Sequence, residues 1–277
     1  MTSNSEANIM STQAPLVFSV SARGTELRYI RFGSGGKALV VVAGMNLTDV
    51  TLQADAIAAA FAPAARDYTV YVFSCRTEPP FGFTVRDMAE DLAAAMQTLG
   101  IRDADLMGNS MGGMIVQCLA MDHPALVHAA VLSSTLCRPN PTSEETFALW
   151  RDTALRGDPA AVNDVSFRRI YTEKNRADNA AVFAALLPLG TARECARFAV
   201  MAEACRRFDR AAELGKIHCP VLVVGVWGDM VLSGKASVEL AERLGCELRM
   251  YEGYGHCVCD EAPDFQRQML DFFRKSR

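Results

Sequence analysis

Six residues near the middle of the chain have the spacing of a turn that presents a reactive serine. Gly108 to Gly113 read Gly-Asn-Ser-Met-Gly-Gly, after an apolar segment ending at Met107 and before a stretch of helical composition, Met114 to Met121. A tight turn between a strand and a helix projects the Ser110 hydroxyl from the sheet as a nucleophile, and glycines on both sides keep side chains off the neighbouring backbone. The following helix points its first amides at the same place, so the Met111 amide is predicted to stabilise an oxyanion.

This motif needs support, because G-x-S-x-G occurs by chance in roughly one chain in ten of this length. A nucleophilic serine requires a base to take its proton, and the chain has four histidines. His123, His128 and His218 lie at a helix end or before strands, whereas α/β sheets carry their chemistry at the carboxyl ends of strands. His256 follows the strand expected to end near Tyr251, in a glycine-containing loop, and is the predicted base.

The base in turn needs a carboxylate that holds its tautomer. Asp229 follows the buried strand predicted over 220–226 and is the predicted acid, although an aspartate in such a loop can also be an ordinary turn residue. Glu252 and Asp260 lie within four residues of His256, so the sequence leaves them open as alternatives.

The composition indicates one large α/β domain, and the partner we expect for it is a small-molecule substrate. The chain has 277 residues, 50% of them hydrophobic, and a net charge of −4. That charge argues against nucleic acid and anionic membranes as partners, and the apolar runs are too short to span a bilayer. Residues 1–15 are polar and are predicted to be a disordered tail rather than a signal peptide, so we expect a cytoplasmic protein. No feature indicates an oligomer.

Nine scattered cysteines suit a reduced, cytosolic protein. Cys257 and Cys259 form a C-x-C pair with no second pair nearby, which is a poor zinc pattern. Residues one apart on an extended chain also point to opposite sides. We therefore predict neither a metal site nor a disulfide here, and no cofactor.

Hydrophobic patterning predicts strands alternating with helices. Strands are expected over 16–21, 26–32, 38–43, 69–73, 103–107, 128–134, 220–226 and 247–251, with helices over 84–99, 114–121, 237–244 and 263–274. This alternation is typical of a mostly parallel sheet with helices on both faces. Residues 138–214 contain only helical stretches, over 147–155, 180–187 and 193–206. They are predicted to be a helical lid inserted into a core formed by 16–137 and 215–277.

These motifs, in the order Ser110, Asp229, His256, resemble the α/β-hydrolase superfamily over nearly the whole chain. The elbow is similar to those of 3-oxoadipate enol-lactonase-like proteins and of meta-cleavage-product hydrolases. The resemblance implies that the Met45 amide is the second oxyanion donor. Ala43-Gly44 stands where family members often have His-Gly, so the loop lacks its usual polar anchor.

We therefore expect a serine hydrolase that cleaves a small, fairly apolar ester or lactone through an acyl-enzyme. Three alternatives remain open from the sequence. The same triad could hydrolyse a C–C bond or act as a cofactor-free perhydrolase, or the scaffold could bind a ligand without catalysis.

Overall fold

The fold is built on an eight-stranded sheet. A computed structural model describes residues 14–277. Most of the tail predicted over 1–15, namely residues 1–13, lies outside the described residues. The strands are β1 (Leu16–Ala22), β2 (Thr25–Phe32), β3 (Lys37–Val42), β4 (Tyr68–Phe73), β5 (Ala104–Asn109), β6 (Val127–Ser133), β7 (Val221–Val226) and β8 (Glu247–Tyr251). Their order is β1-β2-β4-β3-β5-β6-β7-β8. Only β2 pairs antiparallel, with β1 and β4, and the other pairs are parallel.

Helices cover both faces of this sheet. They are α1 (Ala54–Ala60), α2 (Val85–Thr98), α3 (Met111–Asp122), α4 (Pro141–Ala154), α5 (Pro159–Ile170), α6 (Glu173–Asp178), α7 (Ala180–Leu186), α8 (Ala192–Arg206), α9 (Gly234–Leu244), α10 (Val258–Glu261) and α11 (Phe265–Lys275), with 3₁₀ turns at Val50–Gln53, Pro124–Leu126 and Ala211–Lys216. Buried side chains of α2, α3 and α9 form one hydrophobic core. Those of α11 form the other, on the opposite face. The mostly parallel sheet with helices on both faces is confirmed.

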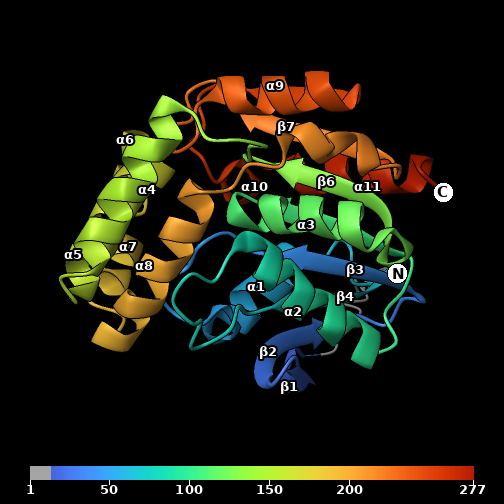
Figure 1. Ribbon diagram of the computed structural model, residues 1–277, viewed down its shortest axis with the longest axis horizontal. Helices are drawn as coiled ribbons and strands as arrows, with labels where there is room; N and C mark the ends of the chain where they lie inside the picture. The colour runs from blue at the N-terminus through green and yellow to red at the C-terminus, as the bar shows by residue number, and fades with distance from the viewer. Residues whose placement is uncertain (1–13) are drawn as a thin grey trace, which may run out of the picture.

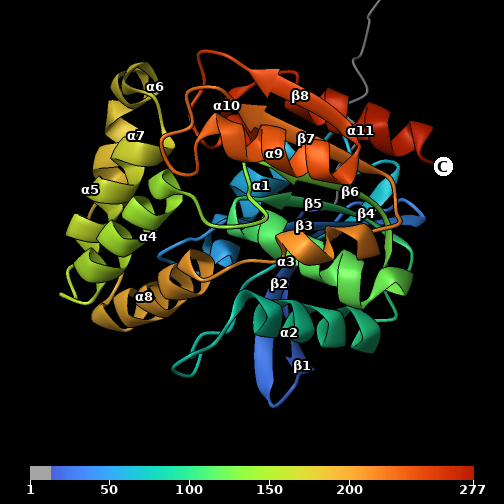
Figure 2. The same ribbon diagram turned by 45° about the horizontal axis from the view of Figure 1, so that its top comes forward.

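Five helices, α4 to α8, lie between β6 and β7. Every residue from 134 to 220 is described, and none of them is in a strand. Figures 1 and 2 show these helices as a group at one end of the sheet, on the left in both views. Within residues 14–277 no helix is long and apolar enough to cross a membrane.

Helix ends follow local capping chemistry. Thr84, the N-cap residue of α2, forms a capping box with Asp87, three residues later in the first turn of the helix. The helix predicted over 147–155 starts earlier, at Pro141, because Asn140 and Ser143 make a second capping box that the hydrophobic pattern did not indicate. The helices α1, α5, α6 and α10 were not predicted from the sequence.

Candidate active site

Ser110 lies in a strained turn between β5 and α3. Its backbone has φ 55° and ψ −120°, a left-handed conformation that few non-glycine residues adopt. A Cβ on Gly112 would lie 1.9 Å from the carbonyl oxygen of Val42, and one on Gly108 would lie 2.5 Å from that of Gly112. Glycine is therefore required at both positions, as the motif predicts.

Hydrogen bonds from β6 and the residues after it hold this turn. The Ser110 amide donates to the Ser133 carbonyl at 2.9 Å, and the Thr135 hydroxyl donates to the Ser110 carbonyl at 2.8 Å. Ser110 is 5% exposed. The turn is thus fixed from both sides, and its hydroxyl belongs to a nearly enclosed site.

Asp229 and His256 form a buried pair. His256 Nδ1 lies 2.8 Å from Asp229 Oδ2, although the two residues come from loops after different strands, β7 and β8. The other Asp229 oxygen, Oδ1, accepts from the Val231 amide at 2.8 Å and the Leu232 amide at 3.0 Å. Burial alone would raise the pKa of Asp229, but the charge of His256 and these hydrogen bonds outweigh it and lower the pKa. Asp229 is therefore held as a carboxylate.

The loop that carries His256 packs closely against the inserted helices. A Cβ on Gly255 would lie 2.4 Å from the Ile170 carbonyl oxygen at the end of α5. The Gly255 amide donates to Glu261 Oε1 at 3.1 Å. Glycine next to the histidine thus lets the α5 end and the histidine loop touch.

Neither alternative carboxylate contacts the imidazole. Glu252 is exposed, and Asp260 accepts a 3.5 Å hydrogen bond from Cys259 Sγ. Asp229 is the carboxylate bonded to His256.

The serine and the histidine are not joined by a hydrogen bond in this structure. His256 Nε2 is buried and has no hydrogen-bond partner among residues 14–277. When an imidazole is neutral and its Nδ1 donates to a carboxylate, its Nε2 is the nitrogen that can accept a proton. In unliganded enzymes such catalytic contacts are often long and tighten when substrate binds.

The two predicted oxyanion donors lie on different elements. Met111 is the first residue of α3, where amides have no helical carbonyl to bond. Met45 lies in the loop after β3, and a Cβ on the adjacent Gly44 would lie 3.3 Å from Ser110 Cβ. That close approach brings the loop directly beside the serine.

A cavity of about 250 Å³ lies beside these residues. Met45, Asn109 and Cys257 line it, whereas Ser110 and His256 do not. Apolar side chains of the inserted segment form another wall: Phe167, Ile170, Leu186 and Leu189. Among the described residues in the lining, Asp260 is the only charged one. The surrounding protein disfavours its charged form and raises the pKa of Asp260.

The reasoning about Cys257 and Cys259 was wrong in one respect. Cys257 immediately precedes the short helix α10, so the segment is not extended, and both side chains line the same cavity. The side-chain amide of Asn109 donates from Nδ2 to Cys257 Sγ at 3.6 Å, linking the residue before the serine to the residue after the histidine. Among residues 14–277 no group of three or more His, Cys, Asp or Glu side chains could hold a metal ion.

Sequence reasoning also missed Arg197 of α8. This arginine is 6% exposed and donates to the carbonyls of Asn46 and Leu47 in the loop after β3. One signal was available, because Arg197, Met201 and Cys205 are spaced by four and therefore share a helix face. A charged residue on an otherwise apolar face calls for a specific partner.

Comparisons with known proteins identify the family and the fold. Residues 57–263 match the family model described as alpha/beta hydrolase fold. A relative from Pseudomonas savastanoi pv. phaseolicola, named "Putative carbamate hydrolase RutD", is 30% identical over 226 residues, covering 76% of this chain and 85% of its own.

Solved structures show the same fold. An α/β hydrolase from a Medee basin deep-sea metagenome, MGS-M2, superposes with a TM-score of 0.80 at 18% identity, over 93% of this chain and 97% of its own. The enol-lactonase from Burkholderia xenovorans LB400 gives a TM-score of 0.77 at 24% identity, over 92% and 99%. At these identities the likeness concerns the fold.

Proposed function

The chain belongs to the α/β-hydrolase fold family, and from this premise we propose that it is a serine hydrolase of a small, largely apolar ester or lactone. Ser110 attacks the carbonyl carbon of the substrate while His256 Nε2 takes the hydroxyl proton. Asp229 holds the imidazole in the required tautomer and stabilises the imidazolium. The amides of Met45 and Met111 bind the oxyanion. His256 then returns the proton to the leaving group, and water releases the acyl group by the same route.

One observation carries the proposal. A buried histidine has its Nδ1 on a carboxylate and its Nε2 unpartnered, in a molecule whose reactive-serine turn is strained. An unpartnered buried nitrogen is unfavourable unless something else requires it. Taking a proton from Ser110 is such a requirement.

The size and polarity of the cavity support the choice of substrate. A space of about 250 Å³ suits a small ligand, and its walls from α5, α7 and the following residues are mostly apolar, with Asn163 and Tyr171 as the polar members. Among the residues that the structure describes, the lining offers no lysine or arginine for an anionic substituent. We propose that residues 138–214, which supply these walls, act as the lid of the site.

A panel of substrates tests this proposal. It contains p-nitrophenyl esters of increasing chain length, lactones and, because a 30% identical relative is named a carbamate hydrolase, aryl carbamates. We expect the wild type to turn over short or medium esters or lactones. Ser110→Ala should lose on the order of a million-fold in kcat. A Ser110→Ala protein that retains a tenth of the activity would contradict an acyl-enzyme mechanism with Ser110 as the nucleophile.

A further inference from the structure

The loop after β3 has little backbone structure of its own to fix it. Residues 43–46 belong to neither a helix nor a strand, and residues 47 and 48 form only a bend. Within the loop, the Asn46 side chain donates to the Gly44 carbonyl at 3.0 Å. An oxyanion donor works only if its position is fixed before the reaction, so the amide of Met45 needs an external support.

Arg197 provides such a support from the inserted helices. Its Nη2 lies 3.1 Å from the Asn46 carbonyl oxygen and 2.6 Å from that of Leu47. These two carbonyls directly follow Met45 in the chain. One guanidinium nitrogen therefore holds two consecutive peptide groups, and a single peptide group, between Met45 and Asn46, separates them from the one that carries the Met45 N–H.

The guanidinium has no competing partner. Among residues 14–277 no carboxylate lies within ion-pairing distance of Arg197, its Nε is buried without a hydrogen-bond partner, and the residue is 6% exposed. Burying a cation without a carboxylate is costly, and hydrogen bonds to carbonyls offset part of that cost. A gain in folding stability therefore does not explain why an arginine is buried at this position.

Packing makes α8 a rigid base for this clamp. Phe198, the next residue, packs against Trp150 of α4 in a tilted arrangement, with ring centroids 6.0 Å apart. Cys205 of the same helix contacts Met45, with its Sγ 3.7 Å from Met45 Sδ. The helix thus touches the loop at two points, through Arg197 and through Cys205.

We propose that Arg197 is a positioning residue of the hydrolase reaction, which fixes the Met45 amide by holding the carbonyls of residues 46 and 47. The inserted helices then complete the oxyanion hole and also line the cavity. This inference rests on the proposed function, since it assigns Arg197 a role in that reaction.

The test compares Arg197→Met and Arg197→Lys with a control from the same helix. Arg193→Met is that control, because Arg193 is exposed and pairs with Glu78 instead of the loop. We expect Arg197→Met to lower kcat by about 10- to 100-fold, with KM within about twofold. Arg197→Lys, which keeps a donor, should recover to within about fivefold of the wild type. Arg193→Met should match the wild type.

Hydrogen–deuterium exchange gives a readout that does not need activity. In Arg197→Met, a peptide covering residues 43–48 should exchange at least about threefold faster, while Arg193→Met leaves it unchanged. Unchanged exchange in folded Arg197→Met would overturn the proposal, as would a raised KM at constant kcat or an Arg197→Lys loss equal to that of Arg197→Met. If Arg197→Met does not fold, Arg197→Gln, too short to reach the carbonyls, replaces it with the same expectations. A wild type without turnover would refute the proposed function, yet the exchange measurement would still decide the role of Arg197.

Discussion

At the scale of single residues, Asp229 is the most constrained member of the site. Its two oxygens have separate tasks, since Oδ2 is bonded to His256 and Oδ1 accepts two backbone amides of its own loop. The amides fix the carboxylate, and the carboxylate in turn fixes the imidazole. A residue of the same shape without the charge therefore isolates the electrostatic part of its role.

Asp229→Asn should lower kcat by about 10⁴-fold and leave KM nearly unchanged, because an amide leaves the imidazole in the wrong tautomer. Asp260→Asn and Glu252→Gln are the matched controls, with folding checked by thermal melting. An active Asp229→Asn, together with an inactive Asp260→Asn or Glu252→Gln, would mean that the acid is assigned to the wrong residue.

The glycines of the serine turn are a second feature at this scale. Gly112→Ala places a methyl group 1.9 Å from the Val42 carbonyl oxygen, and backbone cannot move away cheaply. We expect this variant to lose about 3 kcal/mol or more of its free energy of unfolding and to melt at a temperature lower by about 10 °C. Gly36→Ala, whose Cβ would meet no atom within 4 Å, should melt like the wild type. Equal melting of the two variants would contradict the tight packing of the turn.

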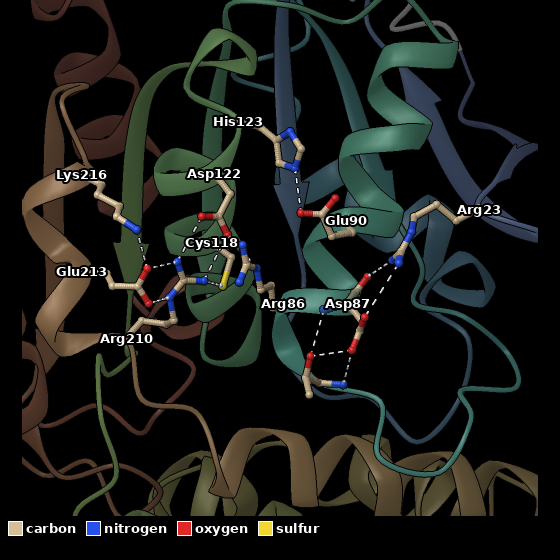
Figure 3. A network of polar contacts seen from close by, with 11 residues as sticks. Arg23, Arg86, Asp87, Glu90, Cys118, Asp122, His123, Arg210, Glu213 and Lys216 are labelled. Carbon is tan, nitrogen blue, oxygen red and sulfur yellow. Dashed lines mark hydrogen bonds and ion pairs between the residues drawn. The ribbon is translucent and has the colours of Figure 1, made fainter.

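At the scale of elements, a partly buried ion cluster joins the exit of the inserted segment to the serine helix. Arg210, just before the 3₁₀ turn Ala211–Lys216, donates to both Asp122 oxygens at 3.1 Å, and Asp122 ends α3 (Figure 3). The hydrogen bond from Arg210 lowers the pKa of Asp122. Glu213 also contacts Arg210. The cluster fixes the end of the helix that begins at the serine.

Arg210→Met should therefore destabilise the protein by about 2–3 kcal/mol near neutral pH, because it leaves Asp122 largely buried beside only the exposed Arg86. Because the pKa of Asp122 is lower in the folded protein, its ionised carboxylate stabilises the fold at pH values above 3.8, the ordinary pKa of the group. This stability is lost as the pH falls through the lowered pKa of the folded state. The difference between wild type and variant, measured by denaturant unfolding, should shrink as the pH falls below 3.8. A constant difference across that range would contradict the role given to Asp122.

Most elements could be predicted from the sequence because their signals are local. Continuous apolar runs gave β3, β4 and β7, and the glycine spacing gave the serine turn. The helices α1 and α5 were missed since they lack a clear apolar stripe, and the start of α4 depends on a capping box with serine instead of glutamate.

At the scale of the whole molecule, the parallel sheet brings together loops that are distant in sequence. Residues after β3, β5, β7 and β8 meet at one edge, which the alternation of strands and helices predicts. What the sequence could not give is the packing of the inserted helices on that edge. Contacts of Arg197 with Asn46, and of Ile170 with Gly255, depend on the path of some 80 residues without a strand.

The chemistry assigned to this site uses side chains and backbone amides alone. Extensive dialysis against EDTA should accordingly leave kcat and the melting temperature unchanged. Suppose that EDTA removes the activity, that zinc restores it, and that zinc no longer restores it once serine replaces Cys257 and Cys259. That result would contradict the prediction that these cysteines bind no metal.

The central claim is that His256 and Asp229 activate Ser110 as the nucleophile. The most direct measurement is the intact mass of the protein after treatment with a fluorophosphonate, followed by peptide mapping. The account predicts one adduct per chain, on Ser110, that is absent from Ser110→Ala and forms far more slowly in Asp229→Asn. An adduct on another residue, or equal labelling of wild type and Ser110→Ala, would contradict it.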